Sequence, residues 1–177
     1  MAKLKMLFPR QEIETAVNRL AEEITREYRS KNPLILGVLK GAFIFTADLV
    51  RRLNFPLEID FVTLSSYRNE VTSCGEVSMS GFFERDIKGR HIIVVEDIVD
   101  TGLTLGFLID RLLSGSPSEV RICALLEKPS RRKNPLEIDY LGFTVPDRFV
   151  VGYGLDCAEK YRNLPDIYCI EQEGCPR

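Results

Sequence analysis

The sequence predicts a single α/β domain organised around a mostly parallel sheet. Short apolar segments alternate with segments of helical periodicity along most of the chain, which is the pattern of strand–helix–strand units with right-handed crossovers. Residues 92–95, Ile-Ile-Val-Val, form a continuous β-branched run that is typical of a strand covered on both faces. The length of 177 residues fits one domain, since domains average about 150 residues.

Each element is expected for a local reason. Residues 11–29 predict an amphipathic helix, because apolar residues recur there at three- and four-residue steps. Residues 34–38 are too short an apolar run for a helix and predict a buried strand. Further strands are expected over residues 57–63, 120–126, 138–143 and 149–151, and further helices over residues 42–53 and 103–114. The less regular C-terminal part is expected to form a small subdomain or flap.

Composition and charge argue against several classes of protein. A net charge of −2 and a pI of about 5.6 do not favour nucleic-acid binding, which usually needs a basic surface. No apolar run approaches the roughly 18 residues of a membrane span, and the N-terminus lacks the features of a signal peptide, so we expect a cytoplasmic protein. The five cysteines form no CxxC pair and His91 is the only histidine. We therefore expect reduced thiols, no zinc site and a structural role for His91.

A polar segment interrupts the pattern at residues 65–80, SSYRNEVTSCGEVSMS. A polar stretch of this length inside a compact domain is often a functional lid. A hairpin with an exposed turn explains the same composition, and composition alone favours neither interpretation.

Residues 94–105, VVEDIVDTGLTL, carry the strongest chemical signal. Three carboxylates, Glu96, Asp97 and Asp100, lie at the C-terminal end of an expected strand, where ligands bind in open α/β sheets. Residues 101–104 then lead into a helix N-terminus whose free N–H groups favour a phosphate. One loop thus offers acidic groups for a sugar diol and a cradle for a phosphate, the two ends of a ribose 5-phosphate. An acidic N-cap on an ordinary helix would explain Asp100 alone, but not all three carboxylates.

This segment resembles the phosphoribosyl diphosphate (PRPP) motif of type I phosphoribosyltransferases. Further segments resemble the hypoxanthine-guanine members in the same order along the chain, over roughly residues 34–170: Leu39-Lys40-Gly41, Ser66-Tyr67, Glu127-Lys128 and FVVGYGLD at residues 149–156. The PRPP motif alone indicates the superfamily, and the later segments indicate the branch that uses 6-oxopurines. The resemblance implies a type I fold within one domain, residues 1–177. It also implies a hood built mainly from residues 150–177 and the N-terminus, with a flexible lid at about residues 65–80.

The resemblance implies roles for the residues that bind PRPP. Glu96 and Asp97 would hold the ribose hydroxyls, directly or through Mg²⁺, and Asp100 would move the proton at purine N7. The loop that would bind the 5′-phosphate comprises Asp100, Thr101, Gly102, Leu103 and Thr104. Pyrophosphate would be bound by Lys40, Gly41 and Arg162, and Ser66 and Tyr67 would lie in the lid. The peptide bond before Lys40 is often cis in the family. Without the resemblance, Lys40 would be interpreted as a solvated charge, and the alternative for Arg162 is a surface ion pair.

A second group of residues is implied for the purine. Lys128 would donate to O6, Phe149 would stack on the base, and the backbone of Val150 would meet its edge. Asp156 would help to hold a second Mg²⁺, mostly through water. The simpler alternatives are a surface lysine at 128 and a core aromatic at 149, and we interpret Arg131-Arg132-Lys133 as a solvated loop.

The implied activity is purine salvage by a glycosyltransferase that binds nucleotides. It would transfer the 5-phosphoribosyl group from PRPP to N9 of hypoxanthine or guanine, giving IMP or GMP and pyrophosphate. The expected partners are these small molecules and further copies of the chain in a homodimer or homotetramer, with no nucleic acid and no membrane. Two alternatives stay open: a range of bases that includes xanthine, and a regulator of the same fold that senses PRPP or nucleotides.

Overall fold

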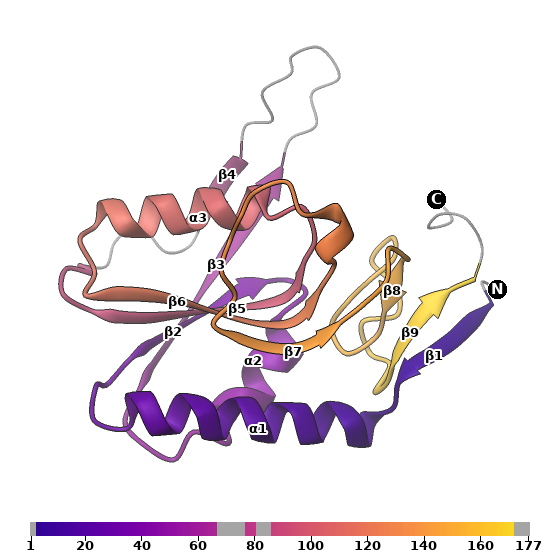
Figure 1. The fold of residues 1–177 in the computed structure, drawn as a ribbon, viewed down its shortest axis with the longest axis horizontal. Helices are drawn as coiled ribbons and strands as arrows, with labels where there is room; N and C mark the ends of the chain where they lie inside the picture. The colour runs from indigo at the N-terminus through magenta and orange to yellow at the C-terminus, as the bar shows by residue number, and fades with distance from the viewer. Residues whose placement is uncertain (1–2, 67–76, 81–85, 172–177) are drawn as a thin grey trace, which may run out of the picture.

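The computed structural model describes residues 3–66, 77–80 and 86–171 (Figure 1). Within these residues a six-stranded sheet has the order β4-β3-β2-β5-β6-β7. Its strands are β2 (Leu34–Leu39), β3 (Glu58–Ser66), β4 (Val77–Ser80), β5 (His91–Val99), β6 (Glu119–Glu127) and β7 (Tyr140–Thr144). All neighbouring pairs are parallel except β3 and β4, which are antiparallel. The predicted α/β class with a mostly parallel sheet is confirmed.

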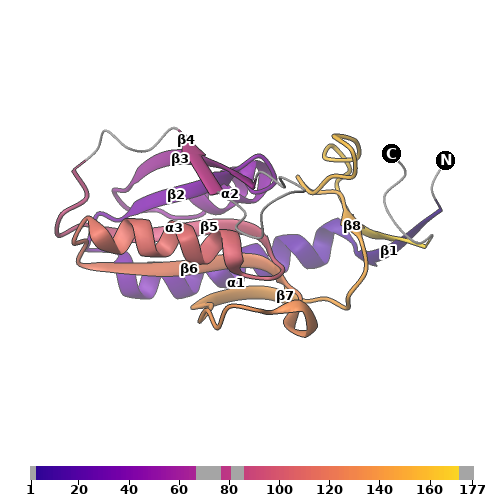
Figure 2. The same ribbon diagram turned by 90° about the horizontal axis from the view of Figure 1, so that it is seen from above.

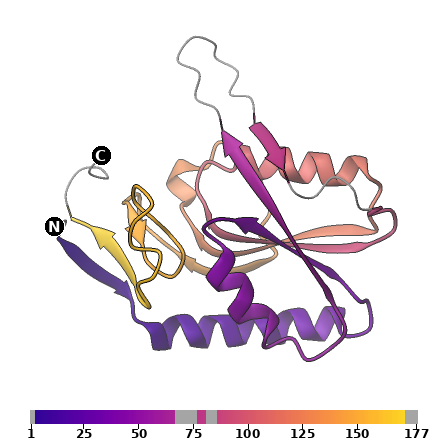
Figure 3. The ribbon, with the colours of Figure 1, turned by 180° about the vertical axis from the view of Figure 1, so that it is seen from behind.

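Helices cover both faces of this sheet. On one face lie α1 (Arg10–Tyr28) and α2 (Phe43–Val50), side by side in the view from behind (Figure 3). On the other lies α3 (Leu103–Ser114). The apolar series predicted for the first helix is fully buried, and burial of each such side chain contributes roughly 1.5–3 kcal/mol. The sheet therefore lies between two apolar cores.

A small antiparallel sheet lies at one end of the long axis, near both termini (Figure 2). It has the order β1-β9-β8 and comprises β1 (Leu4–Phe8), β8 (Val150–Val151) and β9 (Ile167–Ile170). Its connection to the core includes Asp166, whose Oδ1 accepts a hydrogen bond from the backbone N–H of Arg10, 2.7 Å away. That contact caps the first turn of α1 with a side chain from the far end of the chain. The sequence prediction did not include β1.

Several element boundaries differ from those predicted. The second helix ends at Val50 rather than at residue 53, and β5 continues through the carboxylates to Val99. Strand β3 reaches Ser66 and pairs with β4, so the two flanks of the polar segment form hairpin strands. Residues 67–76, with the turn or lid between them, lie outside the described residues. In the described part of the chain, no helix is long and apolar enough to cross a membrane.

Candidate active site

The candidate site lies where β2, β5 and β6 end, as predicted from the positions of the carboxylates. The backbone N–H of Lys128, just after β6, donates to the carbonyl of Val99 at 2.9 Å. This bond places the proposed purine-binding lysine beside the loop that follows β5. Parallel strands bring their carboxyl ends to one edge, which explains why segments far apart in the sequence meet here.

Two neighbouring carboxylates, Glu96 and Asp97, occupy the last part of β5. Burial, and then the charge of Asp97, raise the pKa of Glu96 well above its usual range. Burial also raises the pKa of Asp97. A Cβ added at Gly41 would collide with the Asp97 carboxylate, so the absence of a side chain at Gly41 lets the Lys40–Gly41 turn pack against this pair. The arrangement suits a cation or a hydroxyl-rich ligand, because like charges side by side are otherwise unfavourable.

The predicted phosphate loop connects β5 to α3. Gly102 has a φ of 77°, the left-handed region that glycine tolerates best. The N-cap residue of α3, Gly102, contributes no side-chain cap, and the N–H groups at a helix N-terminus favour an anion. A cavity of about 110 Å³ is lined by four of the five predicted phosphate residues, Asp100, Thr101, Gly102 and Thr104, and by Glu96. Leu103 does not line it, although its backbone N–H donates to Thr101 Oγ1 at 3.4 Å.

Two of the three predicted pyrophosphate residues, Lys40 and Arg162, contact the same carboxylate, Glu159, which sequence reasoning missed. Lys40 Nζ lies 3.2 Å from Glu159 Oε2, and Arg162 Nη2 lies 3.3 Å from the same oxygen. Arg162 also pairs with Asp156 at 2.9 Å and donates to the carbonyl of Gly154. The Arg162 side chain is mostly buried and contacts several acceptors. It therefore does more than form one ion pair at the surface. The peptide bond between Leu39 and Lys40 is cis.

Three of the predicted purine residues follow β6 or lie at or just before the start of β8, whereas Asp156 pairs with Arg162. Lys128 is only 7% exposed, so it is not a surface lysine, and burial lowers its pKa. Its Nζ lies 5.9 Å from the centroid of the Phe149 ring. That ring is 51% exposed, so Phe149 is available for stacking and is not a core aromatic. Val150 is buried at the start of β8.

The interpretation of residues 131–133 as a solvated loop is wrong for Arg132, whereas Arg131 and Lys133 are exposed as expected and Arg131 also forms ion pairs. Arg131 Nε lies 2.8 Å from Asp100 Oδ1, and its Nη1 lies 3.3 Å from Asp147 Oδ1. Arg132 is mostly buried and pairs with Glu127 at 3.2 Å. A run of basic residues is usually solvated, but two of these arginines form ion pairs with nearby carboxylates, Arg131 with Asp100 and Asp147, and Arg132 with Glu127.

Two further expectations concern residues around the site. Ser66 pairs in register with Val77, and Tyr67 lies outside the described residues. The expectation that all the cysteines are reduced is wrong for Cys157, which is disulfide-bonded, whereas Cys123 and Cys169 are free and buried. That expectation rested on the inferred compartment, which does not determine which cysteines the fold brings together.

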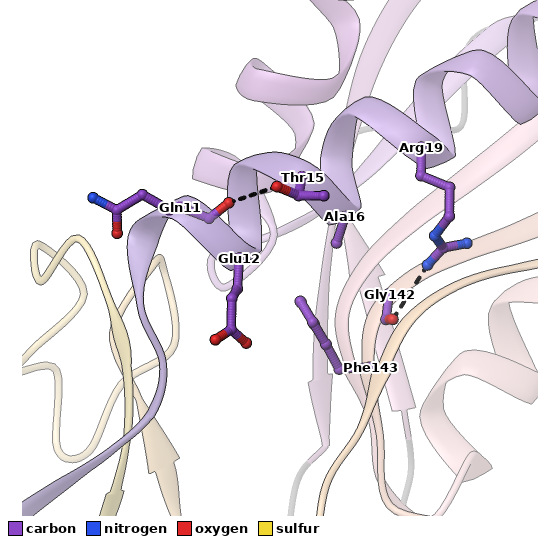
Figure 4. Close-up of a pocket in the computed structure, with 7 residues that line it drawn as sticks. All are labelled: Gln11, Glu12, Thr15, Ala16, Arg19, Gly142 and Phe143. Carbon is purple, nitrogen blue, oxygen red and sulfur yellow. Dashed lines mark hydrogen bonds between the residues drawn. The ribbon is translucent and has the colours of Figure 1, made fainter.

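A larger hollow lies away from these residues, between α1 and β7 (Figure 4). It has a volume of about 430 Å³ and is lined by Gln11, Glu12, Thr15, Ala16, Arg19, Gly142 and Phe143. Arg19 is used structurally there, since its guanidinium donates to the carbonyls of Leu141 and Gly142. Size alone therefore does not mark the functional site, which is recognised by its convergent charges.

Comparison with known proteins identifies the class that this fold and site define. Residues 3–158 match the family model for the phosphoribosyl transferase domain. The chain belongs to the phosphoribosyltransferase family. A hypoxanthine-guanine phosphoribosyltransferase of Bacillus subtilis (strain 168) is 47% identical over 163 residues, 92% of this chain and 91% of the relative. Within the family, the chain therefore groups with the hypoxanthine-guanine phosphoribosyltransferases.

Solved structures and longer relatives agree with this placement. A hypoxanthine-guanine phosphoribosyltransferase of Bacillus anthracis, with HEPES in its active site, has a TM-score of 0.89 at 43% identity and covers 96% of this chain and 99% of that one. The bifunctional protein TilS/HprT of Listeria monocytogenes serotype 4b (strain F2365) is 44% identical over 169 residues. The match covers 96% of this chain but 26% of that relative, so the chain spans about a quarter of the bifunctional protein.

Proposed function

We propose that the chain catalyses Mg²⁺-dependent transfer of the 5-phosphoribosyl group from PRPP to N9 of hypoxanthine or guanine. The products are IMP or GMP and pyrophosphate, and the role is purine salvage. The observation that carries the proposal is the pairing of a phosphate loop with Lys128, a mostly buried ammonium beside the exposed ring of Phe149. Such a charged donor recognises the O6 that hypoxanthine and guanine carry and adenine lacks.

The reaction exchanges one bond at the ribose C1′ for another. The C1′–O bond breaks with its electron pair going to pyrophosphate, and N9 of the purine forms the new bond to C1′. Asp100 accepts the proton from N7 in this direction and returns it in the reverse direction. Lys40, Gly41 and Arg162 bind the leaving pyrophosphate. Ser66 and Tyr67 belong to the lid that excludes water from the oxocarbenium-like centre.

The donor set at the end of β5 fits a hard divalent cation. Glu96 and Asp97 supply carboxylate oxygens, the ligands that Mg²⁺ prefers, and Mg²⁺ usually takes one or two carboxylates together with substrate oxygens and water. The described residues contain no cluster of three or more potential ligands. In the proposed site, PRPP and water would supply the remaining ligands, and Asp156 would help to hold a second ion. Mg²⁺ would supply neutralisation of the diphosphate charge.

The alternative regulator is not favoured. Such a protein needs a basic surface for nucleic acid, and the net charge is −2. The alternative base, xanthine, also carries O6, so Lys128 does not distinguish it. A comparison of hypoxanthine, guanine and xanthine as substrates separates these readings.

Assembly and location also belong to the proposal. A homodimer or homotetramer would cover an apolar face on α2 and β3, where Phe43, Ile59 and Phe61 are 42%, 43% and 38% exposed. Light scattering of the wild type and of Ile59→Glu tests this, and the expected result is a smaller particle for the variant. For a cytoplasmic location, the free thiols of Cys123 and Cys169 are supporting observations, and the disulfide of Cys157 argues the other way.

The direct test is product formation from hypoxanthine and PRPP. With Mg²⁺ present, we expect IMP and pyrophosphate in equal amounts, and with excess EDTA we expect neither. Absence of product from a protein that still binds PRPP would contradict the proposal. The next measurement would then be PRPP-dependent binding of RNA or DNA.

A further inference from the structure

Arg131 approaches the proposed proton-transfer carboxylate from the purine side of the site. It is the last residue of the short 3₁₀ turn Pro129–Arg131, which follows Lys128 directly. Its guanidinium contacts two carboxylates, Asp100 through Nε at 2.8 Å and Asp147 through Nη1 at 3.3 Å. One cation thus bridges the phosphate loop and the segment that leads to Phe149.

The loop that carries Arg131 is fastened to the phosphate loop by its backbone. The N–H groups of Lys133 and Asn134 both donate to the carbonyl of Thr101, at 2.9 and 3.1 Å. A Cβ added at Gly106 would collide with the Asn134 side-chain amide. Arg131 is therefore carried by a segment whose position relative to Asp100 is fixed, which is the requirement for a precise contact.

The two oxygens of the Asp100 carboxylate are not equivalent. Oδ1 is buried, and among the described residues it accepts no hydrogen bond of good geometry, so the Arg131 guanidinium is its charge partner. The Asp100 side chain as a whole is 39% exposed. The exposed oxygen is therefore Oδ2, which is free to meet a substrate. An ion pair between two fully exposed side chains would instead leave both carboxylate oxygens accessible to solvent.

We infer that Arg131 is a positioning residue for the transfer reaction: it holds Oδ1 of Asp100 so that Oδ2 faces N7 of the purine. This inference rests on the proposed function, in which Asp100 accepts the N7 proton. Arg131 itself neither gains nor loses a proton. Its contribution is orientation, which matters because a misplaced base loses much of its rate even when substrate binding persists.

The test is a double-mutant cycle on Arg131 and Asp100, with steady-state kinetics on hypoxanthine. Arg131→Ala is expected to lower kcat about tenfold while KM for PRPP changes less than about twofold, since orientation affects the reaction more than ground-state binding. Arg131→Lys, which keeps the charge, is expected to recover part of the loss. In the Asp100→Asn background, Arg131→Ala is expected to have no further effect, because residues that act through one another are not additive.

Lys133→Ala is the matched control, because it removes one exposed positive charge from the same loop and is expected to keep wild-type kinetics. Thermal melting checks that each variant folds. If Arg131→Ala fails to fold, Asp147→Asn removes only the outer contact of the guanidinium and is expected to lower kcat about twofold with KM unchanged. Unchanged kcat in the folded Arg131→Ala or Asp147→Asn variant, or additive losses in the cycle, would overturn the inference. An inactive wild type would instead refute the proposed function.

Discussion

The two ends of β5 and β6 carry charges in opposite arrangements. At the amino end, Glu119 contacts positive or donor groups: His91 Nδ1 lies 2.7 Å and Lys31 Nζ lies 3.3 Å from its Oε1. Burial opposes ionisation there, but hydrogen bonds from His91 and Lys31 outweigh it and lower the pKa of Glu119 to about 2. At the carboxyl end, burial raises the pKa of both Glu96 and Asp97, which lie side by side.

The difference separates charges that stabilise the fold from charges that serve a ligand. Paired charges at the amino end contribute to stability and need nothing further. Adjacent carboxylates at the carboxyl end lower the stability of the fold until a cation or substrate binds. A pair of carboxylates with raised pKa in such a position indicates a functional site. Substitutions at the two ends should therefore affect activity and stability in opposite ways.

The largest expected effect is on catalysis by Asp100. Asp100→Asn removes the carboxylate that we propose accepts the N7 proton, so kcat should fall by roughly 10²-fold or more, the usual scale for a general base. Binding of PRPP, measured by calorimetry, should be largely kept. An unchanged kcat would remove Asp100 from the proton-transfer role.

The next effect concerns recognition of the base by Lys128. Lys128→Ala removes the charged donor that we propose for O6, a contact worth about 1.5–3 kcal/mol, so kcat/KM for hypoxanthine should fall roughly 10- to 100-fold. KM for PRPP should stay near the wild-type value, which serves as the internal control. Full kcat/KM for hypoxanthine in the variant would show that the purine pocket lies elsewhere.

A smaller effect, of opposite sign, is expected for stability at the carboxyl end. Asp97→Asn removes one of two adjacent like charges and keeps an oxygen that can accept from the N–H of Ile98. In EDTA the melting temperature should rise by about 2–4 °C, the shift that accompanies roughly 1 kcal/mol in a protein of this size. Transferase activity should be lost. A lower melting temperature would mean that the pair is not a stability cost.

The smallest effect is expected at the amino end. Glu119→Gln should lower the melting temperature at pH 7 by about 2–4 °C or less, because partly exposed ion pairs contribute about 1 kcal/mol or less. Kinetic constants should not change. Since the pKa of Glu119 falls from 4.5 unfolded to about 2 folded, its contribution is present above pH 4.5 and is lost as the pH falls towards 2. The difference between the two proteins should therefore vanish in acid, and a difference that persisted there would contradict the assignment.

The sequence predicted the central part of the molecule well because local patterns determine it. Residues 92–95 are buried on both faces of the sheet, and Leu103–Ser114 is helical as predicted. The small sheet β1-β9-β8 could not be predicted from local patterns in the same way, because β1 pairs with β9, more than 150 residues later. A strand that depends on a distant partner leaves little trace in its own sequence.

In the candidate site, too, the residues within motifs could be predicted, whereas the residues that depend on tertiary contacts could not. Motifs indicated Asp100 and Lys128, and both lie at the carboxyl ends of the central strands. Arg131 and Glu159 were missed, because a charged residue in a loop gives no sign of which opposite charge the fold will bring to it. Their contacts with Asp100 and Lys40 follow from tertiary structure alone.

The most direct test of the account is to measure consumption of hypoxanthine, guanine, xanthine, adenine and uracil in parallel, with PRPP and Mg²⁺. Turnover of hypoxanthine and guanine, with adenine and uracil inert, is the predicted result, because we propose that Lys128 donates to O6 of the purine. Turnover of adenine at a comparable rate, or of none of the bases, would contradict the assignment of the carboxyl end of the sheet to 6-oxopurine transfer.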